Sequence, residues 1–387
     1  MRFFGRSRVG NTDLIACRSR KILNFFVQVI MKFADYDLCL ITDEKERMYF
    51  LGFSSTDGYV VHSKNKTTLV IDKRYYYAAK KRLEPKGFEV VCGSDFTFLS
   101  EAALSNDVRV LGIDFSVTTL KQRETLERAL PKVEFFDIGP ELEYEASVKH
   151  PEEIKTIAKA CAIAEKSFQE TLPFLEVGVT EADIAAELEY RFKKNGASDK
   201  SFDTIVGFGA NSAVPHHQTG KTKLKENVPV LMDFGCVYSG YCSDMTRTMF
   251  FGEPDEKFLR AYKAVYEAHF AALNGVKAGM TGREADAIAR NVIEKYGYAK
   301  YFTHSLGHGI GVHIHEYPCL TPSERGAACV LENGMVYSDE PGVYFDGKFG
   351  IRIEDSCYMK DGKTHTFMKE DKKLIVIKNG EVQKYVF

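Results

Sequence analysis

The chain has 387 residues, more than twice the ~150 residues of a typical domain, so two domains are expected. Hydrophobic residues make up 44% and charged residues 27%, which provides enough apolar side chain for a core and excludes a disordered chain. The 52 basic and 54 acidic side chains leave a net charge of -2, so no overall field attracts nucleic acid or an anionic membrane. The chemistry of the protein must therefore come from local sites.

Nine cysteines are scattered along the chain and never form a C-x-x-C pair. This usage is typical of reduced thiols, and we expect a cytoplasmic protein. Arginines precede an apolar run over 22–31, which is one feature of a cleaved signal or transit peptide. Leu23, Phe26, Val27 and Ile30, however, form one stripe of helical spacing, which favours a first core helix after an extension over 1–16. No stretch of 18 or more apolar residues is present to cross a membrane.

From about residue 18 to 140, short β-rich runs alternate with helical runs. The pattern predicts an α/β domain with a mixed or parallel sheet and helices near 75–83 and 118–130. The expected strands are Leu38–Ile41, Tyr59–Val61, Thr68–Ile71, Glu89–Val91, Val108–Ile113 and Val133–Ile138. The pattern stops near residue 140, and a long helix is expected from about 151 to 172. We therefore divide the chain into an N-terminal extension over 1–16, an α/β domain over 17–145 and a second domain over 146–387.

The second domain repeats a pattern of turn, helix and histidine-bearing β-rich stretch. Residues 178–180 open one expected helix, and residues 279–281 open another about 100 residues later. A pair of histidines follows each helix, the first including His216 and the second His315. This period is too long for a solenoid and fits a duplicated half-domain with a pseudo-twofold axis, with coincidence as the alternative. An active site between the halves would take residues from both.

Two aspartates lie in apolar, strand-like settings, Asp233 in VLMDFG and Asp244 in CSDMTRT. A lone buried carboxylate is costly, so each needs a partner or a metal. The turn at Ser239-Gly240 predicts a hairpin in which Asp233 opposes residue 246, and this register places Asp244 diagonally on the same face. The two carboxylates should therefore converge, and the alternative is that they are separate turn or capping residues.

The C-terminal part repeats the arrangement with Glu340 in SDEPG and Glu354 in GIRIED, joined by an Asp-Gly turn at 346–347. Strand alternation puts Arg352 and Glu354 on one face. Between the two hairpins lies a glycine-rich stretch that carries His308. Two Asp, two Glu and one His balance two divalent cations, whereas these carboxylates without metal would repel one another and be forced to protonate. The set suits Mn2+ or Co2+, with Zn2+ as a second choice, because a structural zinc site would use thiolates.

The five residues resemble the metal ligands of the pita-bread metallopeptidases, in the branch of Xaa-Pro dipeptidases (prolidases) and aminopeptidase P. The matching contexts are MDFG for Asp233, SDMTRT for Asp244, GHGIG for His308, EPGVY for Glu340 and RIED for Glu354. The resemblance covers the chain from about 148 to the end, and residues 20–140 resemble the creatinase-type N-terminal domain more loosely. It implies a creatinase-like α/β domain followed by a pita-bread domain, two divalent metal ions per chain, and a homodimer that acts on proline-containing peptides.

The same resemblance extends to other polar residues of the expected pocket. His216 and His315 are similar to the family's substrate and catalytic histidines, and His304 is similar to a further pocket histidine. Arg352 is similar to the arginine beside the last ligand. His304 could instead be a core histidine, and Arg352 could form a structural ion pair. The neighbouring His217 is expected to have no role.

The expected mechanism uses two metal ions about 3.5 Å apart, which bridge one water, lower its pKa and give a hydroxide that attacks a substrate carbonyl. Glu340 would carry the proton to the leaving nitrogen, and a histidine such as His315 would donate to the tetrahedral oxyanion. The resemblance adds that the bond is Xaa-Pro at a peptide N-terminus. The alternatives are a methionine aminopeptidase, which usually lacks a preceding domain, and a catalytically inactive scaffold that binds proteins, which would typically have lost ligands.

The residue four positions after His315 bears on the expected length of the substrate. Some dipeptidases of the family carry an arginine there, which can bind the carboxylate of a dipeptide, and here the residue is Cys319. The departure favours Xaa-Pro-Yaa substrates over dipeptides, unless another cation such as Arg352 binds the carboxylate.

Overall fold

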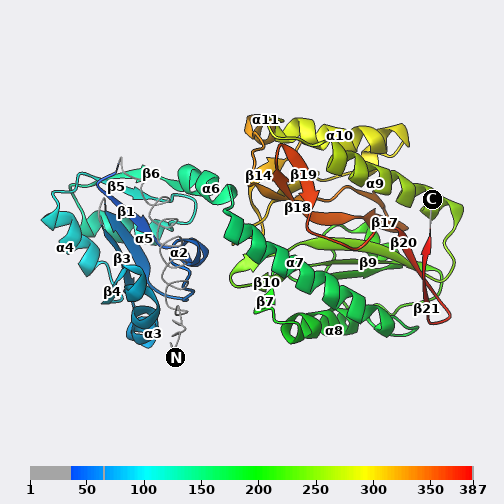
Figure 1. Ribbon diagram of the computed structural model, residues 1–387, viewed down its shortest axis with the longest axis horizontal. Coiled ribbons are helices and arrows are strands. Elements are labelled where there is room, and N and C mark those ends of the chain that lie inside the picture. The colour runs from blue at the N-terminus through cyan, green and yellow to red at the C-terminus, as the bar shows by residue number, and fades with distance from the viewer. Residues whose placement is uncertain (1–35, 64–65, 386–387) are drawn as a thin grey trace, which may run out of the picture. The chain divides into compact units, whose positions relative to one another are not determined.

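The computed structural model describes residues 36–63 and 66–385, and the chain divides into two compact units between Glu145 and Ala146 (Figure 1). The expected first core helix over 22–31 and the extension over 1–16 lie outside the described residues. Each unit has its own hydrophobic core and is described by itself.

Among the described residues of the N-terminal unit, six strands form one mixed sheet in the order β4-β3-β2-β1-β5-β6. Here β1 pairs antiparallel with β2 and parallel with β5, so the mixed sheet has both kinds of ladder around its centre. The strands are β1 (Leu38–Ile41), β2 (Tyr59–Ser63), β3 (Lys66–Ile71), β4 (Glu89–Cys92), β5 (Val110–Ile113) and β6 (Glu134–Asp137). The helices are α2 (Glu44–Leu51), α3 (Lys73–Leu83), α4 (Thr97–Ser105), α5 (Leu120–Ala129) and α6 (Gly139–Ser147).

Helix α2 is absent from the sequence-based expectation because its apolar residues are consecutive and form no stripe of helical spacing. Its two ends have local causes. The side chain of Asp43 accepts hydrogen bonds from the backbone N–H groups of Lys45 and Glu46 at the start. Gly52 adopts the left-handed conformation, with φ of 64°, at the end. Capping chemistry therefore marks this helix where periodicity does not.

The C-terminal unit packs helices on both sides of a mixed sheet that has ten strands among the described residues. Figure 1 shows α7 and α8 along one side of this sheet and α9 and α10 along the other. The helices are α7 (Pro151–Thr171), α8 (Glu181–Lys194), α9 (Glu256–Gly275), α10 (Gly282–Lys295) and α11 (Glu324–Ala328). The strands are β7 (Asp199–Lys200), β8 (Ile205–Phe208), β9 (Val228–Phe234), β10 (Cys236–Tyr238), β11 (Tyr241–Cys242), β12 (Met245–Phe251), β13 (Gly307–Gly309), β14 (Glu316–Leu320), β15 (Val336–Asp339), β16 (Gly342–Phe345), β17 (Phe349–Arg352), β18 (Glu354–Lys360), β19 (Lys363–Thr366), β20 (Leu374–Lys378) and β21 (Glu381–Tyr385).

The two halves of the C-terminal unit begin their second helices in the same way. Thr180 caps α8 and Thr281 caps α10, and each hydroxyl accepts from the backbone N–H three residues on. Each threonine also forms an isolated antiparallel bridge, with Lys223 in the first half and with Val330 in the second. The repeat seen in the sequence thus corresponds to matching helix starts, each bridged to the segment that follows its histidine stretch.

Two hairpins carry the expected carboxylates, and their registers agree with the sequence. Asp233 on β9 lies opposite Thr246 on β12, as the turn at 239–240 predicts. In the second hairpin, Gly342 on β16 lies opposite Arg352 on β17, and the same register continued by two residues places Glu340 opposite Glu354. Thr246 also lies opposite Glu354 on β18, so the central strand β12 joins the two hairpins.

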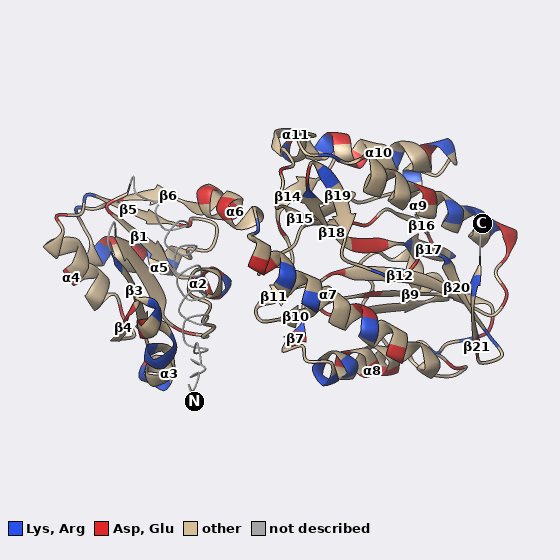
Figure 2. Cartoon of the chain, viewed as in Figure 1, with Lys and Arg blue, Asp and Glu red and all other residues tan. Residues whose placement is uncertain are grey.

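Charge is distributed differently on different helices. Figure 2 shows both signs interspersed along α7 and α8, whereas lysine and arginine gather on α3. No helix among the described residues is long and apolar enough to span a bilayer.

Candidate active site

A cavity of about 1100 Å³ opens in the C-terminal unit, slightly above the roughly 300–1,000 Å³ of typical small-molecule sites. Every residue that the sequence predicts for the site lines this one cavity. These residues are His216, Asp233, Asp244, His304, His308, His315, Glu340, Arg352 and Glu354. They come from both halves of the unit, because strands that are distant in sequence are neighbours in the sheet.

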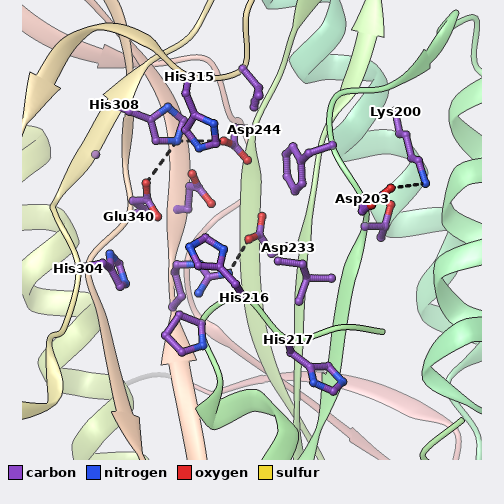
Figure 3. Close-up of a pocket in the computed structure, with 18 of the residues that line it drawn as sticks. Lys200, Asp203, His216, His217, Asp233, Asp244, His304, His308, His315 and Glu340 are labelled. Carbon is purple, nitrogen blue, oxygen red and sulfur yellow. Dashed lines mark hydrogen bonds and ion pairs between the residues drawn. The ribbon is translucent and has the colours of Figure 1, made fainter. Parts of the chain in front are cut away.

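Asp244, His308 and Glu354 form a compact group in which one candidate ligand atom from each lies within 4.8 Å of the others. Nε2 of His308 is 3.5 Å from Oδ2 of Asp244 and 3.5 Å from Oε1 of Glu340. Figure 3 shows His308 facing both of these carboxylates. The fold therefore brings one nitrogen and three carboxylates to one place.

The imidazole of His308 directs a lone pair at these carboxylates. Its Nδ1 lies 3.0 Å from the carbonyl oxygen of Gly309, which can only accept a hydrogen bond, so Nδ1 carries the proton. Burial, with a smaller effect of His315, lowers the pKa of His308 to about 4, and the ring is neutral at pH 7. A lone pair aimed at the oxygens of ionised carboxylates is repulsive unless a cation lies between them. This geometry fits a metal ion, with Gly309 fixing the tautomer of the ligand.

Two carboxylate oxygens lack hydrogen-bond partners within the described part of the chain, as expected for ligands of a metal ion. Oδ1 of Asp233 and Oδ1 of Asp244 are buried and have no hydrogen-bond partner among the described residues. Burial raises the pKa of Asp244 and of Glu354 well above the usual range, and nearby carboxylates raise both further. Burial also raises the pKa of Glu340 to about 8. A bound cation would stabilise the ionised forms, and this oxygen-rich set with one imidazole fits a divalent ion such as Mn2+.

Arg352 connects the two hairpins at the wall of the cavity. Its guanidinium donates to Oδ2 of Asp233 at 2.5 Å, to the hydroxyl of Thr246 at 3.0 Å and to the hydroxyl of Tyr344 at 2.6 Å. Thr246 donates in turn to a carboxylate oxygen of Glu354. Arg352 thus lines the cavity and forms a structural ion pair, so the two expectations for it are compatible.

His304 is linked to the same network through Tyr344. Its Nδ1 lies 2.8 Å from the carbonyl oxygen of Ser305 and therefore carries the proton. Its Nε2 lies 2.8 Å from the hydroxyl of Tyr344, which donates to it while accepting from Arg352. Burial is the main cause that lowers the pKa of His304 to about 3. His304 is thus both a half-buried, hydrogen-bonded histidine and a residue of the cavity wall.

The other two histidines lie beside the carboxylates. The rings of His308 and His315 have centroids 4.2 Å apart, and burial lowers the pKa of His315. Figure 3 shows His216 close to Asp233, whereas His217 points away from the carboxylates.

Sequence reasoning missed three hydroxyl groups that hold this site together. Ser338 donates to Oε1 of Glu340 at 3.0 Å and accepts from the backbone N–H of His308 at 3.1 Å. The others are Thr246 and Tyr344. Thr246 could have been identified, because the predicted register already placed it opposite Asp233. Nothing in the spacing marks the contact of Ser338 with His308 or that of Tyr344 with His304, because each joins segments that are distant in sequence.

Comparison with known proteins identifies the family. Residues 155–361 match the model of the Metallopeptidase family M24, and residues 27–144 match that of the Creatinase/Prolidase N-terminal domain. The chain belongs to the M24 metallopeptidase family. The expected class of enzyme, a metallopeptidase, is thereby confirmed.

Relatives of this M24 chain extend over both units. The Xaa-Pro dipeptidase of Pyrococcus furiosus is 34% identical over 353 residues, which are 90% of this chain and 99% of that protein. The structure of the Xaa-Pro dipeptidase from Bacillus anthracis matches with a TM-score of 0.85 at 35% identity, covering 92% of this chain and 99% of that chain. The X-Pro aminopeptidase structure from Thermotoga maritima matches with a TM-score of 0.83 at 32% identity, covering 93% and 100%. These matches confirm the predicted fold class, a creatinase-like domain followed by a pita-bread domain.

Proposed function

We propose that this M24 metallopeptidase is an exopeptidase that hydrolyses the Xaa-Pro bond at peptide N-termini with two divalent metal ions. The proposed ligands are Asp233, Asp244, His308, Glu340 and Glu354. The observation that carries the proposal is the neutral imidazole of His308, whose lone pair faces two carboxylates. The similarity to Xaa-Pro dipeptidases and to an X-Pro aminopeptidase supports the choice of bond.

When bound, the ions supply a water of lowered pKa and polarise the substrate carbonyl. Mn2+ is the first choice because oxygen donors outnumber nitrogen four to one in the proposed set, and Co2+ or Zn2+ could occupy the same donors. Arg352 holds one oxygen of Asp233 and leaves the other for an ion.

Glu340 is proposed to move the proton. Its carboxylate is held by Ser338 at the edge of the cluster, 3.5 Å from Nε2 of His308. The nitrogen of an Xaa-Pro bond carries no hydrogen, so it must gain a proton before proline can leave as an amine. Glu340 takes a proton from the attacking water and delivers it to that nitrogen.

Two histidines are proposed to act on the substrate. His315, beside the ligand His308, donates a hydrogen bond to the oxyanion that develops as the carbonyl is attacked. His216, near Asp233, binds and orients the substrate from the other side of the cavity. The network of His304, Tyr344 and Arg352 positions Asp233 and takes no part in proton transfer.

The remaining proposals concern the domain boundaries, the oligomeric state and the cellular location. We place the N-terminal domain at 17–145 and the catalytic domain at 146–387, after the extension over 1–16. The homodimer and the cytoplasmic location stay predictions.

The test is an assay of the Mn2+-loaded protein on matched peptides with proline or alanine at the second position. We expect cleavage of Xaa-Pro and Xaa-Pro-Yaa peptides and little cleavage of Xaa-Ala-Yaa. Equal cleavage of both series would contradict the proposed bond. Selective removal of methionine from Met-Ala-Yaa would instead indicate a methionine aminopeptidase.

A further inference from the structure

A buried carboxylate holds the start of the loop that carries His216. Glu181 is the first residue of α8, and its side chain is 0% exposed. Its Oε1 accepts from the backbone N–H of Phe208 at 2.9 Å and from Nδ2 of Asn211 at 2.8 Å. These contacts attach the end of β8 and the turn after it to the start of α8.

The second oxygen of Glu181 holds the end of the same loop. Oε2 accepts from the backbone N–H of Gly220 at 3.2 Å and lies 3.0 Å from Nε2 of His217. A carboxylate can only accept, so His217 donates through Nε2. One side chain thus binds four donors across residues 208–220, and His216 lies within the segment that it holds.

The position that corresponds to Glu181 in the second half of the unit is occupied by a glycine. There the residue after the capping threonine is Gly282, and a Cβ at that position would lie 1.8 Å from the carbonyl oxygen of Cys319. The backbone of the stretch after His315 therefore packs directly against the start of α10. Each half attaches its histidine-bearing stretch to the start of its own repeat helix, in the first half through a carboxylate and in the second through a glycine.

We propose that Glu181 and His217 are positioning residues for His216, acting through the loop over 208–220. Glu181 lies outside the set of residues that line the cavity, so its effect on catalysis is indirect. The hydrogen bond with His217 fixes the backbone immediately next to His216, and a shift of about 1 Å in a group that contacts substrate can cost roughly 100-fold in rate. This inference rests on the proposed role of His216 in Xaa-Pro hydrolysis.

The primary variants are His217→Ala and His217→Gln. His217 also lines the cavity, and its side chain is 15% exposed, so its replacement should leave the fold intact. We expect His217→Ala to lower kcat on an Xaa-Pro peptide by about tenfold or more, with metal content unchanged. His217→Gln, whose amide can donate to Glu181, should recover much of that loss. Glu181→Gln should lower kcat at least as much, because an amide nitrogen cannot accept from two donors. Glu187→Gln, on the same helix but paired with Arg191, is the matched control and should behave as wild type.

A double-mutant cycle separates positioning from general destabilisation. If His217 acts through His216, the kcat loss caused by His217→Ala should nearly vanish in a His216→Ala background. Hydrogen exchange of the metal-free protein should also rise over 208–220 in Glu181→Gln and stay unchanged in Glu187→Gln.

Two results would overturn the inference while leaving the proposed function in place. The first is a His217→Ala enzyme with wild-type kcat, and the second is a loss of kcat that persists in full in the His216→Ala background. A wild-type protein that binds Mn2+ and cleaves no Xaa-Pro peptide would overturn the proposed function, and this inference with it.

Discussion

Nε2 of His308 lies 3.5 Å from Oδ2 of Asp244, while the protonated Nδ1 of the same ring faces the carbonyl oxygen of Gly309. The two residues come from different halves of the unit, on β13 and immediately before β12. The lone pair and the ionised carboxylate would repel each other without a cation. Their arrangement is therefore the clearest structural sign that the cavity holds metal.

Asp244→Ala should remove at least one of about two bound ions per chain. Asp244 belongs to the compact group with His308 and Glu354, and its Oδ1 is buried without a hydrogen-bond partner among the described residues. The metal-free variant should be nearly as stable as metal-free wild type, because the lost carboxylate was crowded by others. Elemental analysis and thermal unfolding test this, with the exposed Asp199→Ala as control. A variant that retains both ions would contradict the assignment.

His216→Ala and His315→Ala should each lower turnover by ~100-fold or more and keep a wild-type metal content. The reason is that both side chains are proposed to contact substrate and not metal. Steady-state kinetics on an Xaa-Pro peptide, combined with elemental analysis of the same samples, provides the measurement. If His315→Ala lost metal, His315 would be a ligand, and its proposed role as oxyanion donor would be wrong.

Metal affinity should rise with pH between about 6 and 8. In the metal-free protein burial raises the pKa of Glu340 from its usual 4.5 to about 8, and metal binding must displace the proton. Titration calorimetry in buffers of different ionisation enthalpy should therefore detect proton release near pH 7. Affinity that is independent of pH over this range would contradict the protonated state of the metal-free site.

The raised pKa of Glu340 also determines how the stability of the metal-free protein changes with pH. Between pH 4.5 and 8 the folded metal-free state binds more protons at Glu340 than the unfolded state does, so this group lowers the free energy of unfolding as pH rises. The melting temperature of the metal-free Glu340→Gln variant should accordingly fall less with pH than that of wild type. A steeper fall in the variant would show that the pKa of Glu340 is not raised.

Substrates of three residues should be cleaved with higher kcat/KM than Xaa-Pro dipeptides. Cys319 lines the cavity directly across the β13–β14 ladder from His308, and a thiol cannot bind the carboxylate of a dipeptide as a guanidinium does. Cys319→Arg should shift the preference towards dipeptides by ~1–3 kcal/mol, with Cys319→Ser as the uncharged control.

A tenfold preference of the unmodified protein for dipeptides would mean that another cation binds the carboxylate. Arg352 is already bonded to Asp233, and Lys200 is paired with Glu189 and Asp203. Lys200, Arg325 and Arg352 all line the cavity and would then be replaced in turn.

The sequence predicted those parts of the site that depend on local geometry. The register that places Asp233 opposite Thr246 follows from a two-residue turn, in which Ser239 and Gly240 both have positive φ. The contacts of Ser338 with His308 and of Tyr344 with His304 could not be predicted, because they join segments that are distant in sequence. The role of Glu181 could not be predicted either. An acidic residue in the first turn of a helix is common, and only the fold shows that this one is buried.

Metal-dependent cleavage of Xaa-Pro bonds is tested by one measurement, the rate of Xaa-Pro-Yaa hydrolysis before chelation, after chelation and after Mn2+ is added back. We expect hydrolysis by the loaded protein, its loss on chelation and its return with about two ions bound per chain. Full activity in the demonstrably metal-free protein, or no hydrolysis with two ions bound, would contradict it.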